Sequence, residues 1–213
     1  GPPSPGDPGS NFIYPTMSIV DRSGLAPELL AAPTIGRSPH DARVDLLRVA
    51  AWSMLQDDPD HAPYGWSHAL TMPQAVLGIA DAVSDPDRAV AAAATFVLGF
   101  RSTLGNTVLD PAWEPSVPRA IDPHVDHRSF LEAGPDVAAA VVWQASEADL
   151  RHFVRAMVDH AALHADAHLA KYTLACLDAA RDDPPAARLF LAAAAFLGSW
   201  WRTNPVDDGL FSD

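Results

Sequence analysis

Three histidines and the only lysine of the chain lie together in residues 159–171, which read DHAALHADAHLAK. His160, His164 and His168 follow one another at four-residue spacing, and Lys171 comes three residues later. On a helix that turns by about 100° per residue, these positions share one face. Imidazoles at such spacing are typical of transition-metal sites and of acid–base catalysis. The stretch therefore predicts a metal or catalytic site on a helix.

The same face carries apolar residues, namely Phe153, Met157, Ala161 and Tyr172. The histidine row thus lies within or along the edge of the stripe that a helix normally buries. Buried histidine and lysine side chains need partners, which favours a functional site. The alternative is a structural one, in which solvated histidines border the stripe and the lysine extends its charged end to solvent.

Three further histidines could join the row. His68 lies in the apolar segment WSHALT, residues 66–71, and is a candidate partner from a second helix. Taken alone, it would be a satisfied core histidine. His124 and His127 lie in a proline-rich segment and are candidate ligands or simply solvated side chains. A histidine-rich site favours zinc, iron, copper or nickel over magnesium or calcium.

The composition narrows the classes of partner. The chain has 213 residues and a formal net charge of −13, so it lacks the basic surface that nucleic acids and anionic membranes require. A single cysteine, Cys176, excludes an internal disulfide and favours a reducing, cytoplasmic location. The sequence contains no apolar run of about 18 residues, so no membrane span is expected.

The pattern of apolar residues predicts an all-α protein with a single helical domain at residues 17–213, preceded by a linker or expression remnant at residues 1–16. About six helices are expected. A long central helix, which carries the histidine row, should run from the cap formed by Ser146 and Asp149 to about Arg181. The other predicted helices begin near Ser38, at Trp66 or Thr71, and near Pro86, Val137 and Ala186. A short helix is also expected at residues 26–32. Residues 106–134 read as a long loop of the kind that is often functional.

Two segments resemble the questin oxidase-like family. Residues 66–75, WSHALTMPQA, are similar to that family's His-x-(Val/Leu)-Thr-x-x-x-Ala motif, and residues 164–173, HADAHLAKYT, to its His-x-Asp-x-His-x-x-Lys-x-Thr motif. The similarity extends over about residues 40–200. The family's earlier Asn-His and Phe-His motifs have no counterpart here, and the chain is shorter than typical members.

The resemblance implies a helical enzyme of secondary metabolism that oxidises aromatic, polyketide-derived small molecules. Some members of the family are held to use non-haem iron with histidine ligands and a carboxylated lysine. Carried over to this chain, His68, His168 and Lys171 would lie near the metal, with His164 close by. A complete ligand set would draw on further residues or on another chain, the candidates being His40, His61, His124, His127 and His160.

Lysine, unlike arginine, can take the role that the resemblance implies. When its pKa falls on burial, the neutral amine can react with carbon dioxide and become an anionic oxygen ligand. Arginine stays protonated. The alternative is that Lys171 only contacts His168 one helical turn away.

The histidine row favours a transition metal as cofactor, and the family resemblance implies an oxygenase, with iron as the first choice of metal. His168 and Lys171 are the expected catalytic residues, and Tyr64 and Trp66, with Trp143, the expected walls for an aromatic substrate. The alternatives are a metal-dependent hydrolase, in which the metal activates water, and a non-catalytic helical protein that binds a small molecule. The sequence leaves open whether the chain forms a homo-oligomer.

Overall fold

The computed structural model describes residues 13–24, 27–28, 39–116, 126–127 and 129–204. In these ranges the chain is all-α, as predicted, and forms eight α-helices and no strand. The α-helices are α1 (Ile13–Ser23), α3 (Pro39–Gln56), α4 (Ser67–Gly78), α5 (Pro86–Leu104), α6 (Pro135–Gln144), α7 (Glu147–Leu163), α8 (Ala167–Asp182) and α9 (Ala187–Thr203). Four short 3₁₀ turns and one π-helical turn complete these ranges: η1 (Pro59–His61), the π-turn η2 (Ala62–Trp66), η3 (Ala80–Ala82), η4 (Phe130–Glu132) and η5 (Pro184–Ala186).

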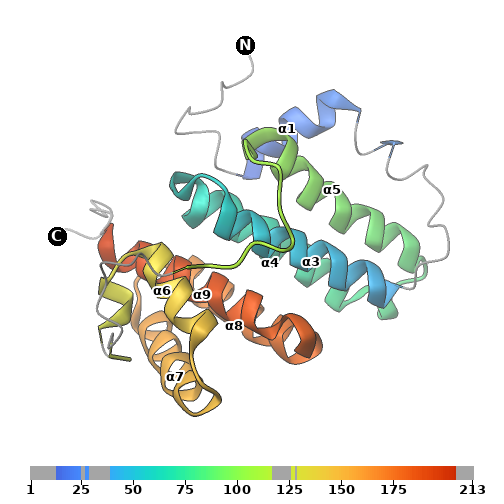
Figure 1. The fold of residues 1–213 in the computed structure, drawn as a ribbon. Coiled ribbons are helices and arrows are strands. Elements are labelled where there is room, and N and C mark those ends of the chain that lie inside the picture. The colour runs from blue at the N-terminus through green and yellow to red at the C-terminus, as the bar shows by residue number, and fades with distance from the viewer. Residues whose placement is uncertain (1–12, 25–26, 29–38, 117–125, 128, 205–213) are drawn as a thin grey trace.

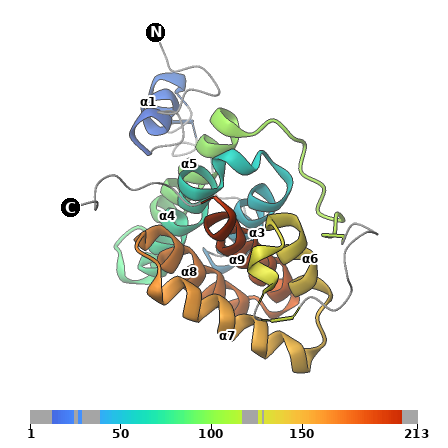
Figure 2. The ribbon, with the colours of Figure 1, turned by 90° about the vertical axis from the view of Figure 1, so that its left-hand side faces the viewer.

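Helix α9 is the centre of the molecule. Figure 2 shows it, in dark red, enclosed by α3, α6, α7 and α8. Its residues from Leu189 to Ser199 are all buried. A helix that is apolar around its whole circumference is stable only when other helices surround it. Four consecutive alanines, Ala192–Ala195, let the neighbouring helices approach closely.

The predicted central helix, running from residue 146 to about Arg181, is wrong in two respects. The chain divides there into α7 and α8, and the central position belongs to α9. His164 has φ −76° and ψ 139°, and Asp166 is also extended, so the helical hydrogen bonds stop between them. Asp166 then caps α8, because its Oδ1 accepts a hydrogen bond from the backbone N–H of His168 at 2.7 Å.

Other predicted helix ends agree with the structure. Ser146 caps α7 by accepting a hydrogen bond from the backbone N–H of Asp149 at 3.2 Å. Helix α5 begins at Pro86 and ends at Leu104 as expected, although its cap is Asp85. Helix α4 begins at Ser67, next to the earlier of the two predicted starts, Trp66 and Thr71, and Pro73 lies inside it. Three predicted features lie outside the described residues. They are the cap Ser38, most of the short helix expected at residues 26–32, and the polar tail from residue 205.

Helix α1 begins at Ile13, before the boundary at residue 17 that the sequence predicts. It packs on α5 at the edge of the molecule (Figure 1). The contact is close at Gly99, where a Cβ atom would lie 2.5 Å from Cγ2 of Val20. The part of the predicted linker at residues 1–12 lies outside the described residues. Among those described, no helix combines the length and the apolarity that a membrane crossing requires.

Candidate functional site

Tyr64, His68, Asp166 and His168, here called the histidine cluster, meet where the start of α4 contacts the start of α8. The carboxylate of Asp166 is the centre of this group. Its Oδ1 lies 2.7 Å from Nδ1 of His168, and its Oδ2 accepts a hydrogen bond from the Tyr64 hydroxyl at 3.1 Å. A carboxylate can only accept when ionised, so Nδ1 of His168 carries the proton and Nε2 is left with a free lone pair in the neutral ring.

The pKa of Asp166 fits this arrangement. Burial raises the pKa, but the hydrogen bonds from the backbone and ring of His168, the His168 charge and the Tyr64 hydroxyl together lower it below its ordinary value. Asp166 is therefore ionised at neutral pH and orients the His168 imidazole. The His168 side chain is 28% exposed, so the ring is accessible from solvent.

His68 lies against His168, with ring centroids 5.0 Å apart at an interplanar angle of 85°. Its Nδ1 donates to the backbone carbonyl of Tyr64, so Nε2 is again the free nitrogen. His68 is buried and stacks on Phe100 at 6.3 Å. Burial lowers the pKa of His68, and the charges of His168 and Lys171 lower it further. The hydrogen bond to the Tyr64 carbonyl and the charge of Asp166 raise the pKa, but the net shift is downward. His68 is thus a neutral imidazole at neutral pH.

The π-helical turn η2 positions Tyr64 for both contacts. The turn ends at Trp66, and α4 continues from it without a break. The Tyr64 carbonyl accepts a hydrogen bond from the His68 ring, while the Tyr64 ring packs edge-on against His168 at 5.1 Å. Single π-turns within helices occur frequently at functional sites. The expectation that Tyr64 forms a wall for substrate stays a prediction; in the structure its hydroxyl donates a hydrogen bond to Asp166.

Lys171 is exposed on α8, one turn after His168. The expectation that it shares a buried apolar face is wrong, because Leu169, Tyr172 and Thr173 are the buried residues beside it. Lys171 lies near enough to His68 for its charge to affect the pKa of that ring. The burial that would make its amine neutral and reactive toward carbon dioxide is absent.

His160 and His164 belong to a different environment. Their rings are 5.5 Å apart, and His164 also packs on Trp201 at 5.0 Å. Nε2 of His160 lies 3.2 Å from the Gly198 carbonyl, while Nδ1 of His164 accepts a hydrogen bond from the Asp166 backbone N–H at 3.1 Å. Both rings line a cavity of about 540 Å³ that Arg202 also borders. The break after Leu163 is what separates this pair from His168.

The remaining predicted site residues do not reach the histidine cluster. Trp66 is fully buried and packs against His61 and under the Arg101 guanidinium, so it offers no wall to a ligand. Trp143 lies in another cavity, with Trp52. His127 contacts Asp126 and His152. His124 and the side chain of His40 lie outside the described residues.

Asp166 is the residue that sequence reasoning missed, since the expected site consists of histidines, Lys171 and aromatic residues and gives no role to the aspartate between His164 and His168. The signal was present in the sequence. An aspartate one or two residues before a helical segment is a strong N-cap candidate, and a cap directs its carboxylate toward the first turn. That geometry is what brings Asp166 to both the backbone and the ring of His168.

The described part of the molecule is therefore a helical bundle with a solvent-accessible histidine, oriented by a carboxylate and packed on a neutral, buried histidine. Comparison of the chain with family models, with curated proteins and with solved structures finds no match.

Proposed function

We propose that the histidine cluster is the catalytic centre of an enzyme that oxidises a phenolic aromatic small molecule, the activity that the resemblance of the two sequence motifs implies. The observation that supports it most directly is the pairing of His168 Nδ1 with Asp166 Oδ1 at 2.7 Å. A carboxylate that fixes the tautomer of an imidazole is the usual arrangement of a general base. Nε2 of His168 is the nitrogen that would accept a proton.

Each member of the cluster has a role in this proposal. His168 would accept the proton of a substrate hydroxyl, and Asp166 would stabilise the imidazolium that forms. The Tyr64 hydroxyl holds the second carboxylate oxygen in place. His68 is neutral and buried, so its Nε2 can accept a hydrogen bond from a second substrate hydroxyl without adding charge to the site. The phenolate produced by proton removal is the electron-rich form that reacts with dioxygen.

Iron, the cofactor that the resemblance implies, would find two suitable nitrogens in the cluster. Nε2 of His68 and Nε2 of His168 are both free, and in each ring an oxygen acceptor fixes Nδ1, as in many metal-bound histidines. Among the described residues, however, no group of three or more histidine, cysteine or acidic side chains is placed to hold a metal ion. These residues therefore do not complete an iron site, and the proposed proton transfer depends on the imidazole and carboxylate alone.

Oxygen consumption tests the proposal. The purified chain, with and without added Fe²⁺, is incubated with a panel of hydroxylated anthraquinones in an oxygen electrode. We expect consumption by the native chain and a loss of at least about 10²-fold in rate in His168→Gln, the usual size of a general-base contribution. His152→Gln, which changes an exposed histidine of α7, is the matched control and should keep the native rate.

Equal rates in the native chain and in His168→Gln would overturn the proposed role of the cluster. Turnover of an ester or amide panel without oxygen uptake would instead point to the hydrolase alternative.

A further inference from the structure

A second cavity, here called the tryptophan cavity, lies between α3, α6 and α9, far from the histidine cluster. Its volume is about 790 Å³, and it is lined by Asp45, Arg48, Val49, Trp52, Pro111, Trp143, Pro185, Ala186, Arg188 and Leu189. Arg188 is at the first turn of α9 and Trp201, beside the histidine cluster, near its last, so they are roughly 20 Å apart at about 1.5 Å per residue. The tryptophan cavity is thus a separate site.

Flat aromatic groups form its walls. Trp52 and Trp143 have ring centroids 6.0 Å apart at an angle of 46°, and Trp113 packs edge-on against Trp52 at 6.3 Å. Trp52 and Trp143 are only partly buried, so their ring surfaces remain available. The volume falls in the range of small-molecule sites, which are mostly apolar with few polar groups. Such walls favour a planar aromatic ligand, because offset and edge-to-face contacts between rings are stabilising.

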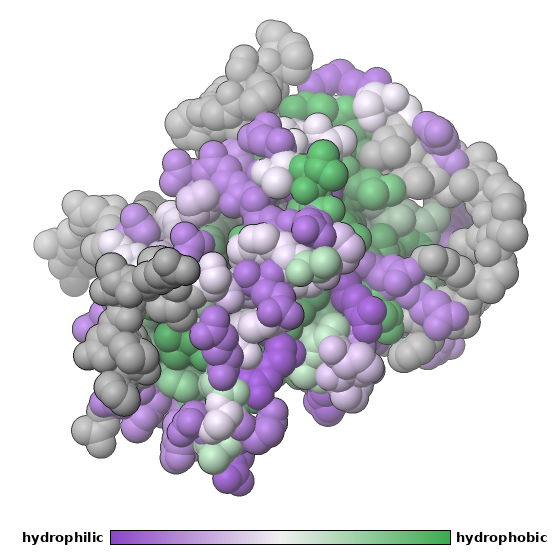
Figure 3. All heavy atoms as spheres, viewed as in Figure 1, coloured by the Kyte–Doolittle hydropathy of each residue, from purple (hydrophilic) through white to green (hydrophobic). Residues whose placement is uncertain are grey.

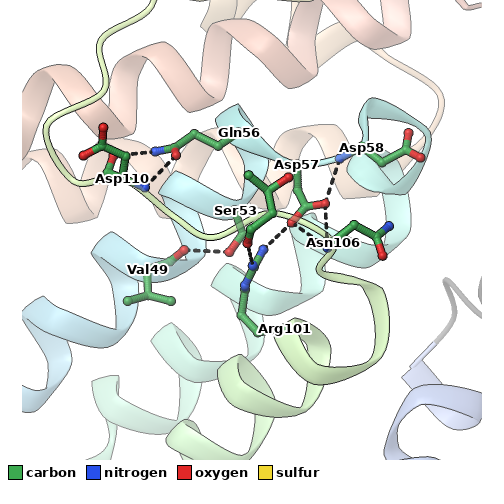
Figure 4. Close-up of polar contacts among 9 residues, drawn as sticks. Val49, Ser53, Gln56, Asp57, Asp58, Arg101, Asn106 and Asp110 are labelled. Carbon is green, nitrogen blue, oxygen red and sulfur yellow. Dashed lines mark hydrogen bonds and ion pairs between the residues drawn. The ribbon is translucent and has the colours of Figure 1, made fainter.

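The loop that supplies Pro111 is held firmly against α3. Gln56 and Asp110 exchange two hydrogen bonds, with Nε2 of Gln56 donating to the Asp110 carbonyl at 2.8 Å and the Asp110 N–H donating to Oε1 at 2.9 Å. Nearby, the buried carboxylate of Asp57 accepts from Arg101 and from the backbone N–H of Asn106 (Figure 4). The wall is therefore preformed, which lowers the entropic cost of binding.

Arg188 places one positive charge at the edge of the cavity. Its Nη1 donates to backbone carbonyls at the end of α6, with Val142 at 3.0 Å and Ala145 at 2.8 Å, so the guanidinium is fixed. Its Nη2 pairs with Glu147 at 2.6 Å, and the Arg188 side chain is 28% exposed. The Glu147 side chain is 86% exposed, and such pairs contribute little to stability. A carboxylate from outside can therefore replace that of Glu147.

The other charges of the cavity limit the ligand to one negative group. Arg48 is engaged by the buried Asp183 through two hydrogen bonds of 2.7 Å, and Asp45 adds a negative charge at the same wall. We propose that the tryptophan cavity binds a small planar aromatic monocarboxylate, with its ring packed against the solvent-accessible surfaces of Trp52 and Trp143, which already contact each other, and its carboxylate on Nη2 of Arg188. Glu147 occupies the carboxylate position when the ligand is absent.

Calorimetric titration of the full chain with 2-naphthoate tests this proposal. We expect saturable binding with one site per chain, and at least about fivefold weaker binding of 2-naphthylmethanol and of cyclohexanecarboxylate, which lack the charge and the aromatic ring respectively. Trp143→Leu should weaken 2-naphthoate binding by about fivefold. Equal binding of the three compounds would overturn the proposal.

Glu147→Gln is the decisive variant, because it removes a competitor and not a contact. It should tighten 2-naphthoate binding by roughly two- to fivefold, the equivalent of an exposed ion pair. The matched control is Glu132→Gln, which removes the same charge from an exposed pair with Arg202 at 2.9 Å. Identical affinities in the two variants would contradict the proposed place of the carboxylate.

A third variant separates this site from the histidine cluster. His168→Gln should bind 2-naphthoate as the native chain does, whatever the outcome of the oxygen measurements. Binding that is lost in His168→Gln and kept in Trp143→Leu would place the ligand at the histidine cluster and refute the proposal.

Discussion

Tyr64 and Asp166 are 102 positions apart in the sequence, and a hydrogen bond of 3.1 Å joins the hydroxyl of one to the carboxylate of the other. This contact ties the π-turn before α4 to the cap of α8. It also leaves Oδ1 of Asp166 for His168. The histidine cluster therefore depends on tertiary packing between two helix starts and not on the periodicity of one helix.

Asp166→Asn separates the capping role of this residue from its role beside His168. Asparagine caps helices about as well as aspartate, so the free energy of unfolding should change by less than about 1 kcal/mol. The amide cannot stabilise an imidazolium, and oxidation rates should fall by roughly 10²-fold or more. Urea denaturation and oxygen uptake, measured on the same preparation, check the two halves. A large loss of stability together with the loss of rate would show that the effect is structural.

Lys171→Arg should be nearly silent. Because Lys171 is exposed, the exchange should alter the free energy of unfolding by no more than about 0.5 kcal/mol and leave bound iron unchanged. Metal analysis and thermal denaturation of Lys171→Arg and Lys171→Glu, measured side by side, check this. If iron were lost from the arginine variant and partly restored in the glutamate variant, the carboxylated lysine implied by the family resemblance would be supported.

Arg101→Gln should destabilise the chain by about 3 kcal/mol or more, because it leaves the carboxylate of Asp57 buried without its charged partner. The Asp57 side chain is 1% exposed and is surrounded by α3, the end of α5 and the following loop (Figure 4). Denaturant titration gives the value. Arg155→Gln, which breaks an exposed pair with Asp159 on α7, is the matched control and should cost less than about 0.5 kcal/mol.

Ala193→Leu should destabilise the chain by about 1–3 kcal/mol through overpacking. Ala193 is fully buried in the alanine run of α9, where the neighbouring helices leave no room for a larger side chain. The same exchange at the exposed Ala162 of α7 is the control and should be close to neutral. Equal melting temperatures for the two variants would contradict the central position of α9.

Stability should decrease in mild acid because of His160. Burial lowers the pKa of His160 below 6.5, and the charges of His164 and Arg202 do so too, against the opposing Gly198 carbonyl. The unfolded chain then binds this proton more readily than the folded chain. The free energy of unfolding should fall as the pH drops through about 6.5 and level off below the folded-state pKa.

Urea denaturation between about pH 5 and pH 8 measures this dependence. His160→Gln should make it shallower, while His68, whose pKa is also lowered, retains part of it. His152→Gln should leave the dependence as it is in the native chain. A slope that is the same in all three proteins would exclude His160 as its source.

The all-α class can be predicted well from the sequence because helix formation depends on local signals, such as capping residues and prolines. Ser146 with Asp149, and Pro86 with the end at Leu104, mark helix boundaries that the structure reproduces. The sequence also indicates His68 and His168 as partners, and the structure places their rings in contact. The helix boundaries rest on residue types that act within a turn or two of the chain, whereas the pairing of His68 with His168 comes from the resemblance of the two motifs.

The predictions that were wrong concern long-range packing and the break between α7 and α8, which no strong helix-ending residue marks. His164, Ala165 and Asp166 include neither glycine nor proline, so nothing marks the break except the capping preference of Asp166. Helix α9 lies at the centre because it is apolar on every side. That property is visible in the sequence, but the sequence pattern predicts only a last helix beginning near Ala186 and not its central position. The exposure of Lys171 follows from the break at residues 164–166. Because α7 and α8 are separate helices, the buried face of α8 is not a continuation of the buried face of α7.

The surface in Figure 3 is hydrophilic over most of the visible face, with apolar side chains in scattered patches. The apolar content is concentrated inside, around α9.

The central place of α9 has a consequence for synthesis on the ribosome, where the chain emerges from its N-terminal side. Helices α3 to α8 precede α9 in the sequence, and α3, α6, α7 and α8 pack their apolar faces on it. Until α9 has emerged, those faces have no partner, and a nascent chain in that condition is exposed to aggregation. We therefore expect the bundle to close late and all at once, when its innermost helix arrives.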